Sequence, residues 1–193
     1  MPESDSDNMI EAAPRGDARV DACLEHLSSK IPGSLRTDVY QRQLYSTDAS
    51  IYQVEPLAVV VPQHRDELQA VMESAAEFDV PVVARAAGTS LAGQAIGRAI
   101  IVDFTRHLDR IVSIEAEERR VTVEPGVVLD HLNAELRVHG LQFGPDPASS
   151  NRAAMGGIVS NNSTGSHSIC YGMTADHVQK MEVLLADGSR TVD

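Results

Sequence analysis

The sequence predicts an α+β protein of two lobes, in which each lobe is a small sheet with packed helices. Residues 54–104 alternate apolar, strand-like runs with an amphipathic helix, whereas residues 105–193 begin with the alternating pattern of a hairpin. The chain has 193 residues, of which 42% are hydrophobic, and this suffices for a buried core. Before the lobes we place a helical or extended segment at 17–53 and an acidic tail at 1–16, which we expect to be disordered.

The elements in the first half of the chain follow from the spacing of apolar residues. Apolar residues on one helical face predict helices at about 17–30 and 68–78. Continuous apolar runs predict buried strands at 57–61, 81–84 and 99–104. Strands and helix therefore alternate in the first lobe.

The second lobe is predicted from a hairpin, a helix and a late strand. Residues 110–115 and 119–124 alternate as in a hairpin, and apolar residues at helical spacing follow at 128–136. A further strand is expected at 178–186, followed by the Asp-Gly turn at 187–188. The sequence stops where a partner strand should begin, so we expect this lobe to be truncated.

The most informative segment is the loop that follows the strand at 81–84. Residues 85–94 read Arg-Ala-Ala-Gly-Thr-Ser-Leu-Ala-Gly-Gln. Small residues allow backbone N–H groups to approach a ligand, and successive amides form a concavity that suits a phosphate. The glycine spacing resembles a P-loop, but Gln94 and Ala95 stand where that motif requires Lys and Ser or Thr. We predict a phosphate or pyrophosphate site, with an ordinary glycine turn between strands as the alternative.

A second segment rich in small polar residues extends over 143–178. It contains Phe-Gly-Pro-Asp-Pro-Ala-Ser-Ser from Phe143 and Met-Gly-Gly-Ile-Val-Ser-Asn-Asn-Ser-Thr-Gly from Met155. Irregular segments longer than about 12–15 residues are usually functional or disordered. The regularly placed glycines argue against disorder, so we expect this backbone to fold tightly around a polar group.

Five motifs occur in a fixed order along the chain. They are Arg-Ala-Ala-Gly-Thr-Ser-Leu-Ala-Gly from Arg85, Val-Glu-Pro-Gly-Val from Val123, Gly-Pro-Asp-Pro from Gly144, Gly-Gly-x-x-x-x-Asn-x-x-Gly from Gly156, and Tyr-Gly from Tyr171. Together they resemble the FAD-binding domain of the vanillyl-alcohol oxidase / p-cresol methylhydroxylase type flavoproteins. Within that group the sequence is most similar to FAD-linked 2-hydroxy-acid dehydrogenases of the D-lactate, glycolate and D-2-hydroxyglutarate types. The resemblance covers residues 35–193, and residues 46–52 further resemble the large members with a C-terminal iron–sulfur module.

The resemblance implies FAD bound between the two lobes and covered by a separate C-terminal substrate domain. In such enzymes a hydride passes from the hydroxyl-bearing carbon to flavin N5, while a base takes the hydroxyl proton. It implies an oxidoreductase that converts a 2-hydroxy acid to a 2-keto acid, with an electron acceptor that the sequence does not identify. The substrate domain lies outside this sequence, so we assign no catalytic residue and expect the fragment alone to be inactive. The alternatives are a related FAD-dependent alcohol or aldonolactone oxidase and a non-catalytic flavin-binding module of a multi-subunit complex.

Three groups of residues are implied to hold FAD. Those around the pyrophosphate are Arg85, Ala86, Ala87, Gly88, Thr89, Ser90, Gly93 and Gln94. Those on the flavin or ribityl side are Pro145, Asp146, Ser149 and Ser150. Those close to the isoalloxazine and the diphosphate are Gly156, Gly157, Asn162 and Gly165.

Two departures from the family pattern matter. The common Gly-Gly before the loop glycine is Ala86-Ala87 here, which adds two methyl groups beside the approach to the phosphate. Residues 85–94 contain no histidine, which argues against the histidyl link to flavin that some relatives form at this loop. We therefore expect FAD to be bound non-covalently.

Charge and composition limit the other functions. The net charge is −12, which argues against a nucleic-acid partner, because binding nucleic acid depends on clustered lysine and arginine. No apolar run approaches the roughly 18 residues of a membrane span, and the first residues lack the pattern of a signal peptide. We therefore expect a cytoplasmic protein whose partner is a small hydroxy-acid substrate, with a homodimer as an option.

The cysteines and histidines give no sign of a metal site. Cys23 and Cys170 are widely separated, so any iron–sulfur ligands must lie in a longer full-length protein. The seven histidines have no metal-binding spacing. His167 and His177 flank the Tyr-Gly motif, where a flavin or substrate contact competes with the simpler role of a loop hydrogen bond.

Overall fold

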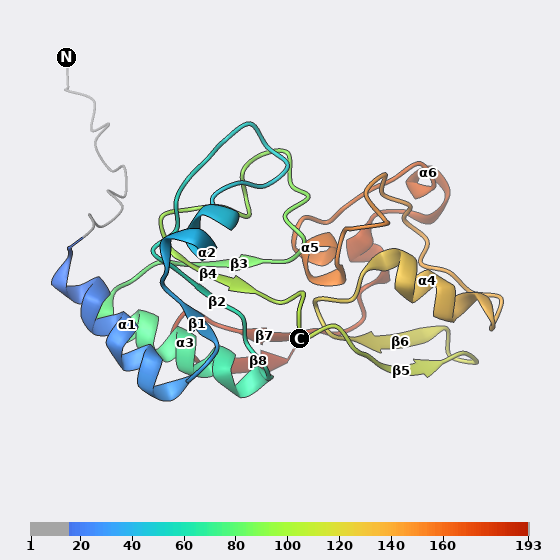
Figure 1. Ribbon diagram of the computed structural model, residues 1–193. Helices are drawn as coiled ribbons and strands as arrows, with labels where there is room; N and C mark the ends of the chain where they lie inside the picture. The colour runs from blue at the N-terminus through green and yellow to red at the C-terminus, as the bar shows by residue number, and fades with distance from the viewer. Residues whose placement is uncertain (1–15, 193) are drawn as a thin grey trace, which may run out of the picture.

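The computed structural model describes residues 16–192 and consists of two lobes that lie side by side (Figure 1). Each lobe has a small sheet with helices packed against it, so the predicted α+β class is confirmed. The predicted acidic tail lies outside the described residues, apart from Gly16.

The first lobe contains a four-stranded sheet. Its order is β1 (Leu35–Arg36), β2 (Ala58–Val60), β4 (Ile100–Asp103) and β3 (Val82–Arg85). The last three strands are parallel, and β1 runs antiparallel to β2. The three predicted strands are confirmed to within one residue at each end. Strand β1 was not predicted, because two residues are too few for a periodic pattern, and it joins the segment before residue 54 to this sheet.

Two helices, α1 (Ala18–Lys30) and α3 (Arg65–Phe78), pack against each other and contribute to the main core (Figure 1). Helix α1 has the predicted extent, whereas α3 begins three residues before the apolar pattern does. The reason is Glu67, whose buried carboxylate accepts hydrogen bonds from the Ser34 hydroxyl and the Gln63 backbone N–H, both at 2.8 Å. Polar contacts therefore hold the first turn, and an apolar pattern does not reveal them.

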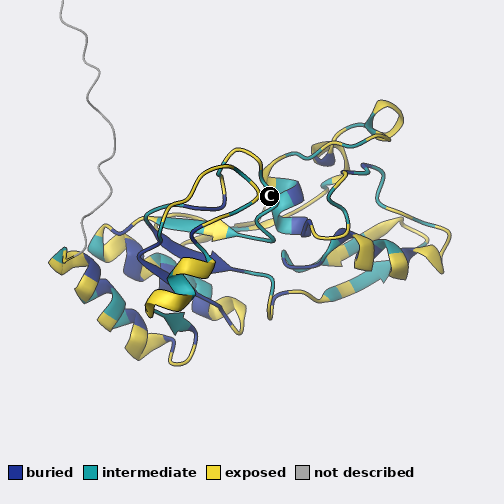
Figure 2. Ribbon diagram, turned by 45° about the horizontal axis from the view of Figure 1, so that its top comes forward, coloured by how far each residue is buried: buried dark blue, intermediate teal, exposed yellow. Residues whose placement is uncertain are grey.

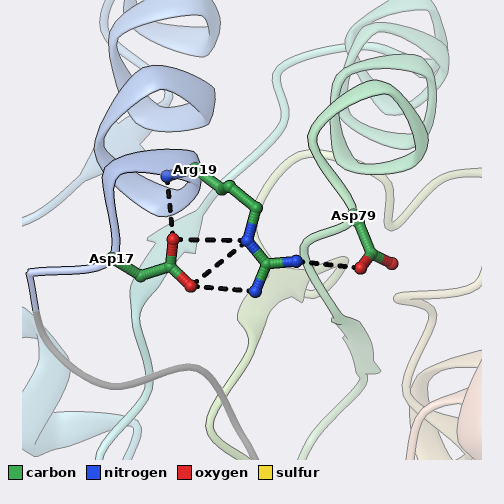
Figure 3. Close-up of polar contacts among 3 residues, drawn as sticks. All are labelled: Asp17, Arg19 and Asp79. Carbon is green, nitrogen blue, oxygen red and sulfur yellow. Dashed lines mark hydrogen bonds and ion pairs between the residues drawn. The ribbon is translucent and has the colours of Figure 1, made fainter.

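Arg19 ties the start of α1 to the end of α3 (Figure 3). Asp17 caps α1 by accepting a hydrogen bond from the Arg19 backbone N–H at 2.9 Å. The Arg19 guanidinium contacts Asp17 at 2.9 Å and Asp79 at 3.0 Å. Asp79 ends α3 in the left-handed conformation with a φ of 53°. Ion pairs this exposed add little stability, so their main effect is on how the two helix ends are placed.

The other face of the first sheet is covered more lightly. Val59, Val61 and Ile101 form a second cluster, against which Tyr45 and Val83 pack. Strands β2 and β4 are buried along their whole length, whereas α2 (Val39–Leu44) has no buried residue (Figure 2). This face is therefore closed largely by the residues around Tyr45.

The second lobe is built on the predicted hairpin and helix, which are confirmed. Strands β5 (Ile111–Glu115) and β6 (Arg120–Val123) pair antiparallel, and α4 (Leu129–Arg137) packs on them. Leu129 and Leu132 are fully buried in this core. A two-stranded hairpin is marginal by itself, so burial against α4 stabilises it.

Three short helical turns follow where irregular backbone was expected. They are α5 (Met155–Ser160), α6 (Ser168–Tyr171) and the 3-10 turn η1 (Thr174–His177). They are too short for an apolar period, and side chains hold them in place: the Asn162 Oδ1 accepts the Ala175 N–H at 2.8 Å. Figure 1 shows α5 between the sheets of the two lobes.

The chain ends in a second hairpin, which corrects the prediction. Strand β7 (Glu182–Leu184) is three residues long rather than nine, because its pairing with a partner of three residues ends there, while residues 178–181 are irregular. The partner, expected beyond the end of the sequence, is present as β8 (Arg190–Val192). This hairpin contacts α3 of the first lobe, where Arg65 pairs with Glu182 at 3.2 Å.

Candidate functional site

The predicted phosphate loop is the crossover between two neighbouring parallel strands. Parallel neighbours need a connection of a dozen or more residues, and most proteins use a helix for it. Here residues 86–99 cross from β3 to β4 without a helix. The loop leaves the carboxyl end of β3, the edge at which ligands bind in open parallel sheets. The topology thus explains both its length and its position.

Several backbone donors in this loop have no partner. Among residues 16–192, no hydrogen-bond acceptor contacts the backbone N–H of Gly88, Thr89 or Ser90. Gly88 and Gly93 have positive φ angles of 66° and 75°, which an L side chain rarely adopts. Successive unpaired N–H groups suit an anionic guest, because a phosphate oxygen can accept several of them. The loop therefore fits the predicted pyrophosphate.

A short segment at 46–53 lies against this loop, and sequence reasoning had used it only for the family resemblance. The Ala49 N–H donates to the Gly88 carbonyl at 3.0 Å. A Cβ added to Gly93 would lie 2.9 Å from the Tyr52 ring, so the ring packs directly on that glycine. No local sequence pattern pairs residues 40 positions apart, so only the fold could reveal this contact.

Asp48 fastens the same segment to the end of the loop. Its carboxylate accepts the Ser50 N–H at 2.8 Å and the Ala95 N–H at 3.4 Å. Burial raises the pKa of Asp48, but the hydrogen bonds from Ser50 and Ala95 outweigh that effect and leave the pKa below its ordinary value. Asp48 is therefore charged at neutral pH and acts as a structural acceptor.

Helix α5 meets the start of the loop through Gly157. A Cβ added to Gly157 would lie 3.2 Å from the Cβ of Ala86. Gly156 packs in the same way on Pro125, and its N–H donates to the Pro125 carbonyl at 2.8 Å. The fold thus brings together two predicted cofactor segments that are 70 residues apart. The methyl group of Ala86, one departure from the family pattern, is accommodated by a glycine.

The predicted flavin-side residues also lie beside a predicted glycine. A Cβ added to Gly165 would overlap the backbone carbonyl of Asp146, so only glycine fits there. The Ser166 N–H donates to the same carbonyl at 3.2 Å, and Pro145 is buried. Asp146 and Gly165 are therefore in direct contact.

Ser149, Ser150 and Asn162 have structural partners of their own. The Ser149 carbonyl accepts the Ala153 N–H at 2.7 Å, and the Ser150 carbonyl accepts the N–H of Asp130 at 3.1 Å. Asn162 is bound to η1 through its side chain. These backbone and side-chain contacts shape the segment and leave the two serine hydroxyls without a protein partner among the described residues.

The two histidines near the Tyr-Gly motif make loop contacts. The His177 Nε2 lies 2.8 Å from the Tyr171 carbonyl oxygen, and the ring packs against Phe143. His167 Nδ1 lies 3.6 Å from the Asp146 carboxylate. In the part of the chain that is described, no group of three or more metal-binding side chains gathers.

A family comparison decides what kind of domain this is. The sequence pattern of the family described as "FAD binding domain" matches residues 56–192, which include the loop, α5, the second lobe and the first lobe from β2 onward. The chain belongs to this family. The resemblance drawn from the five motifs is therefore confirmed, and FAD is the cofactor of the domain.

Full-length relatives of this FAD-binding domain are hydroxy-acid enzymes. The chain is 39% identical over 166 residues to the D-2-hydroxyglutarate dehydrogenase of Pseudomonas putida, covering 84% of the chain and 16% of that enzyme. It is 38% identical over 183 residues to the enzyme of the same name from Pantoea ananatis, and the match covers 93% of the chain and 18% of that enzyme. The glycolate oxidase subunit GlcD of Bacillus subtilis is 36% identical over 149 residues, and the match covers 76% of the chain and 32% of that subunit. The chain thus spans less than a fifth of the two dehydrogenases.

Solved structures share the fold of this FAD-binding domain at low sequence identity. An alkyldihydroxyacetonephosphate synthase superposes with a TM-score of 0.78 at 19% identity, and the match covers 89% of the chain and 34% of the synthase. p-Cresol methylhydroxylase superposes with a TM-score of 0.72 at 18% identity, and the match covers 93% of the chain and 36% of that enzyme. These likenesses establish the p-cresol methylhydroxylase type fold. Within residues 16–192, no helix has both the length and the apolar character needed to cross a bilayer.

Proposed function

We propose that this chain holds FAD non-covalently between the loop at 85–94 and the segments at 145–150 and 156–165. The observation that carries this proposal is the run of unpaired N–H groups at Gly88, Thr89 and Ser90, which suits a pyrophosphate. The contact between Gly157 and Ala86 supports it, because it brings the second glycine-rich segment to the same loop. The residues proposed to contact FAD are those named from the sequence, and Arg85 has the separate role discussed below.

We further propose that the chain is the flavin domain of an oxidoreductase that converts a 2-hydroxy acid to a 2-keto acid. Support comes from the names of its relatives, two of which are D-2-hydroxyglutarate dehydrogenases. Bound FAD would supply the hydride acceptor, and the loop would bind and orient the diphosphate that anchors it. The Gly88, Thr89 and Ser90 N–H groups have no acceptor among the described residues, so binding a diphosphate there would break no protein hydrogen bond.

The visible spectrum of the purified chain tests the cofactor proposal, when it is recorded after FAD has been added and the excess removed by desalting. We expect the flavin absorbance bands to remain with the protein. The activity proposal needs the full-length protein, assayed by dye reduction with D-2-hydroxyglutarate, D-lactate and glycolate. If none of these acids reduces the bound flavin, the activity proposal is contradicted.

A second candidate is a flavin subunit of a larger assembly, favoured by the 36% identity to a protein named as a subunit of glycolate oxidase. Flavin that is reduced only when partner subunits are present would support it. A cytoplasmic location and a homodimer remain predictions. Cell fractionation would test the location, and the mass of the full-length protein measured by sedimentation would test the dimer.

A further inference from the structure

The side chain of Arg85 folds back against the loop that it precedes and binds backbone carbonyls. Its Nη1 donates to the carbonyl oxygens of Thr47 at 2.9 Å, Ala95 at 3.2 Å and Tyr45 at 3.4 Å. Thr47 belongs to the flanking segment, and Ala95 lies at the far end of the loop. One guanidinium group therefore joins the backbone at 45–47 to the far end of the loop, about 50 residues later in the sequence.

The same guanidinium contacts the turn at Gly88 and the ring of Tyr45. A Cβ added to Gly88 would lie 2.7 Å from Arg85 Nη2 and 3.0 Å from its Cζ. The Cζ also lies 5.2 Å from the centre of the Tyr45 ring, a distance at which the ring attracts a cation. Gly88 thus rests directly on the guanidinium, and a side chain at position 88 would displace it.

Tyr45 is itself fixed to the sheet by Asp103 of β4. Its hydroxyl donates to Asp103 Oδ2 at 2.5 Å, while Asp103 Oδ1 accepts the Thr105 N–H at 2.8 Å. Burial, and then the bond to Asp103, raises the pKa of Tyr45, so the phenol stays protonated and remains a donor. Asp103 is the register partner of Arg85 between β4 and β3. A continuous set of contacts therefore runs from the buried sheet to the loop.

We propose that Arg85 is a positioning residue of the cofactor site, which holds the loop at 86–95 and the segment at 46–53 in one arrangement and leaves phosphate recognition to the loop N–H groups. This rests on the proposed function. Arginine suits the role, because its guanidinium is planar, always charged and carries five donors. The whole guanidinium faces protein backbone: Nη1 is shared among three carbonyls, and Nη2 and Nε lie against the turn at Gly88, 2.7 and 3.3 Å from a Cβ added there.

Amide hydrogen exchange of the FAD-free chain, combined with FAD titration, tests this role. We expect Arg85→Met to raise exchange at 46–53 and 86–95 while β2 and β4 stay protected. We also expect FAD affinity to fall about tenfold or more, as for the loss of charged hydrogen bonds. Arg85→Lys keeps a cation and its donors and should recover part of both effects. Arg137→Met, which removes the same charge from an exposed residue of α4 in the other lobe, should change neither.

The outcomes separate this role from the proposed function. If Arg85→Met weakens FAD binding but leaves exchange unchanged, Arg85 is a direct phosphate ligand and the positioning role is overturned. If the wild-type chain does not bind FAD yet the variant still raises exchange in both segments, the proposed function fails and the positioning role stands. Should Arg85→Met not fold, Arg85→Lys provides the test: a single ammonium group does not replace the planar guanidinium that contacts the carbonyls and the Gly88 turn, so exchange at 46–53 and 86–95 should rise above the wild-type level. Unchanged exchange in that variant would overturn the role.

Discussion

The contact between Gly157 and Ala86 offers a quantitative test of how the two lobes meet at the cofactor loop. In Gly157→Ala the new Cβ would lie 3.2 Å from the Ala86 Cβ, inside the 3.5–4.0 Å optimum for carbon pairs. Overpacking of this kind costs about 1–3 kcal/mol, whereas replacing glycine by alanine in a helix gains about 1 kcal/mol. The free energy of unfolding should therefore fall by about 0–2 kcal/mol.

The double-mutant cycle with Ala86→Gly isolates that contact. In the Ala86→Gly background the clash disappears, so Gly157→Ala should become stabilising by up to about 1 kcal/mol. The coupling energy would then be about 1–3 kcal/mol, measured by urea unfolding of the FAD-free chain. Ala84→Gly is the matched control: it changes an exposed residue of β3, two positions before Ala86, and should combine additively with Gly157→Ala. Additivity of the Ala86 pair to within about 0.5 kcal/mol would refute the packing argument.

Three further predictions concern single sites. Gly165→Ala would force a Cβ onto the Asp146 carbonyl, so we expect loss of FAD binding with local rearrangement, seen as a loss of flavin absorbance after desalting; full retention of flavin would contradict it. Cys23 is buried and burial raises its pKa to about 11, whereas Cys170 is exposed, so a thiol reagent should label one cysteine rapidly in the native chain and both after unfolding. The pKa of Asp48 lies below its ordinary value of 3.8, so its contribution to stability is complete above that pH and is lost as the pH falls through the lower, folded-state pKa. The protection factors of the amides at 46–53 should fall in that acidic range, and less steeply in Asp48→Asn.

Particular elements show how far sequence patterns reach. Helix α1 and strands β2, β3 and β4 were predicted closely, because burial on one helical face or along a whole strand leaves a periodic or continuous apolar pattern. Strand β1 and helix α5 were missed, because elements of two and six residues contain too few positions for any period. The start of α3 was misplaced for a different reason, since the buried residue in its first turn is a glutamate with hydrogen-bond partners.

The candidate site divides in the same way. The glycines and hydroxyl residues of the loop indicate a phosphate site from local chemistry alone, and the order of five motifs identifies the family. The role of Arg85 could not be predicted, because its acceptors lie on Tyr45, Thr47 and Ala95. Sequence spacing does not reveal which way a long side chain turns.

The sequence by itself determined that this is an α+β FAD-binding domain, and it predicts which glycine-rich segments serve the cofactor, since backbone approach and family motifs depend on residues near each other in the chain. Only the tertiary structure decided how those segments meet. Gly157 against Ala86, Tyr52 against Gly93 and the carbonyls around Arg85 are contacts between distant residues. Such contacts exist because the parallel sheet and the packing of the two lobes bring separate loops to one edge, and no local pattern encodes that arrangement.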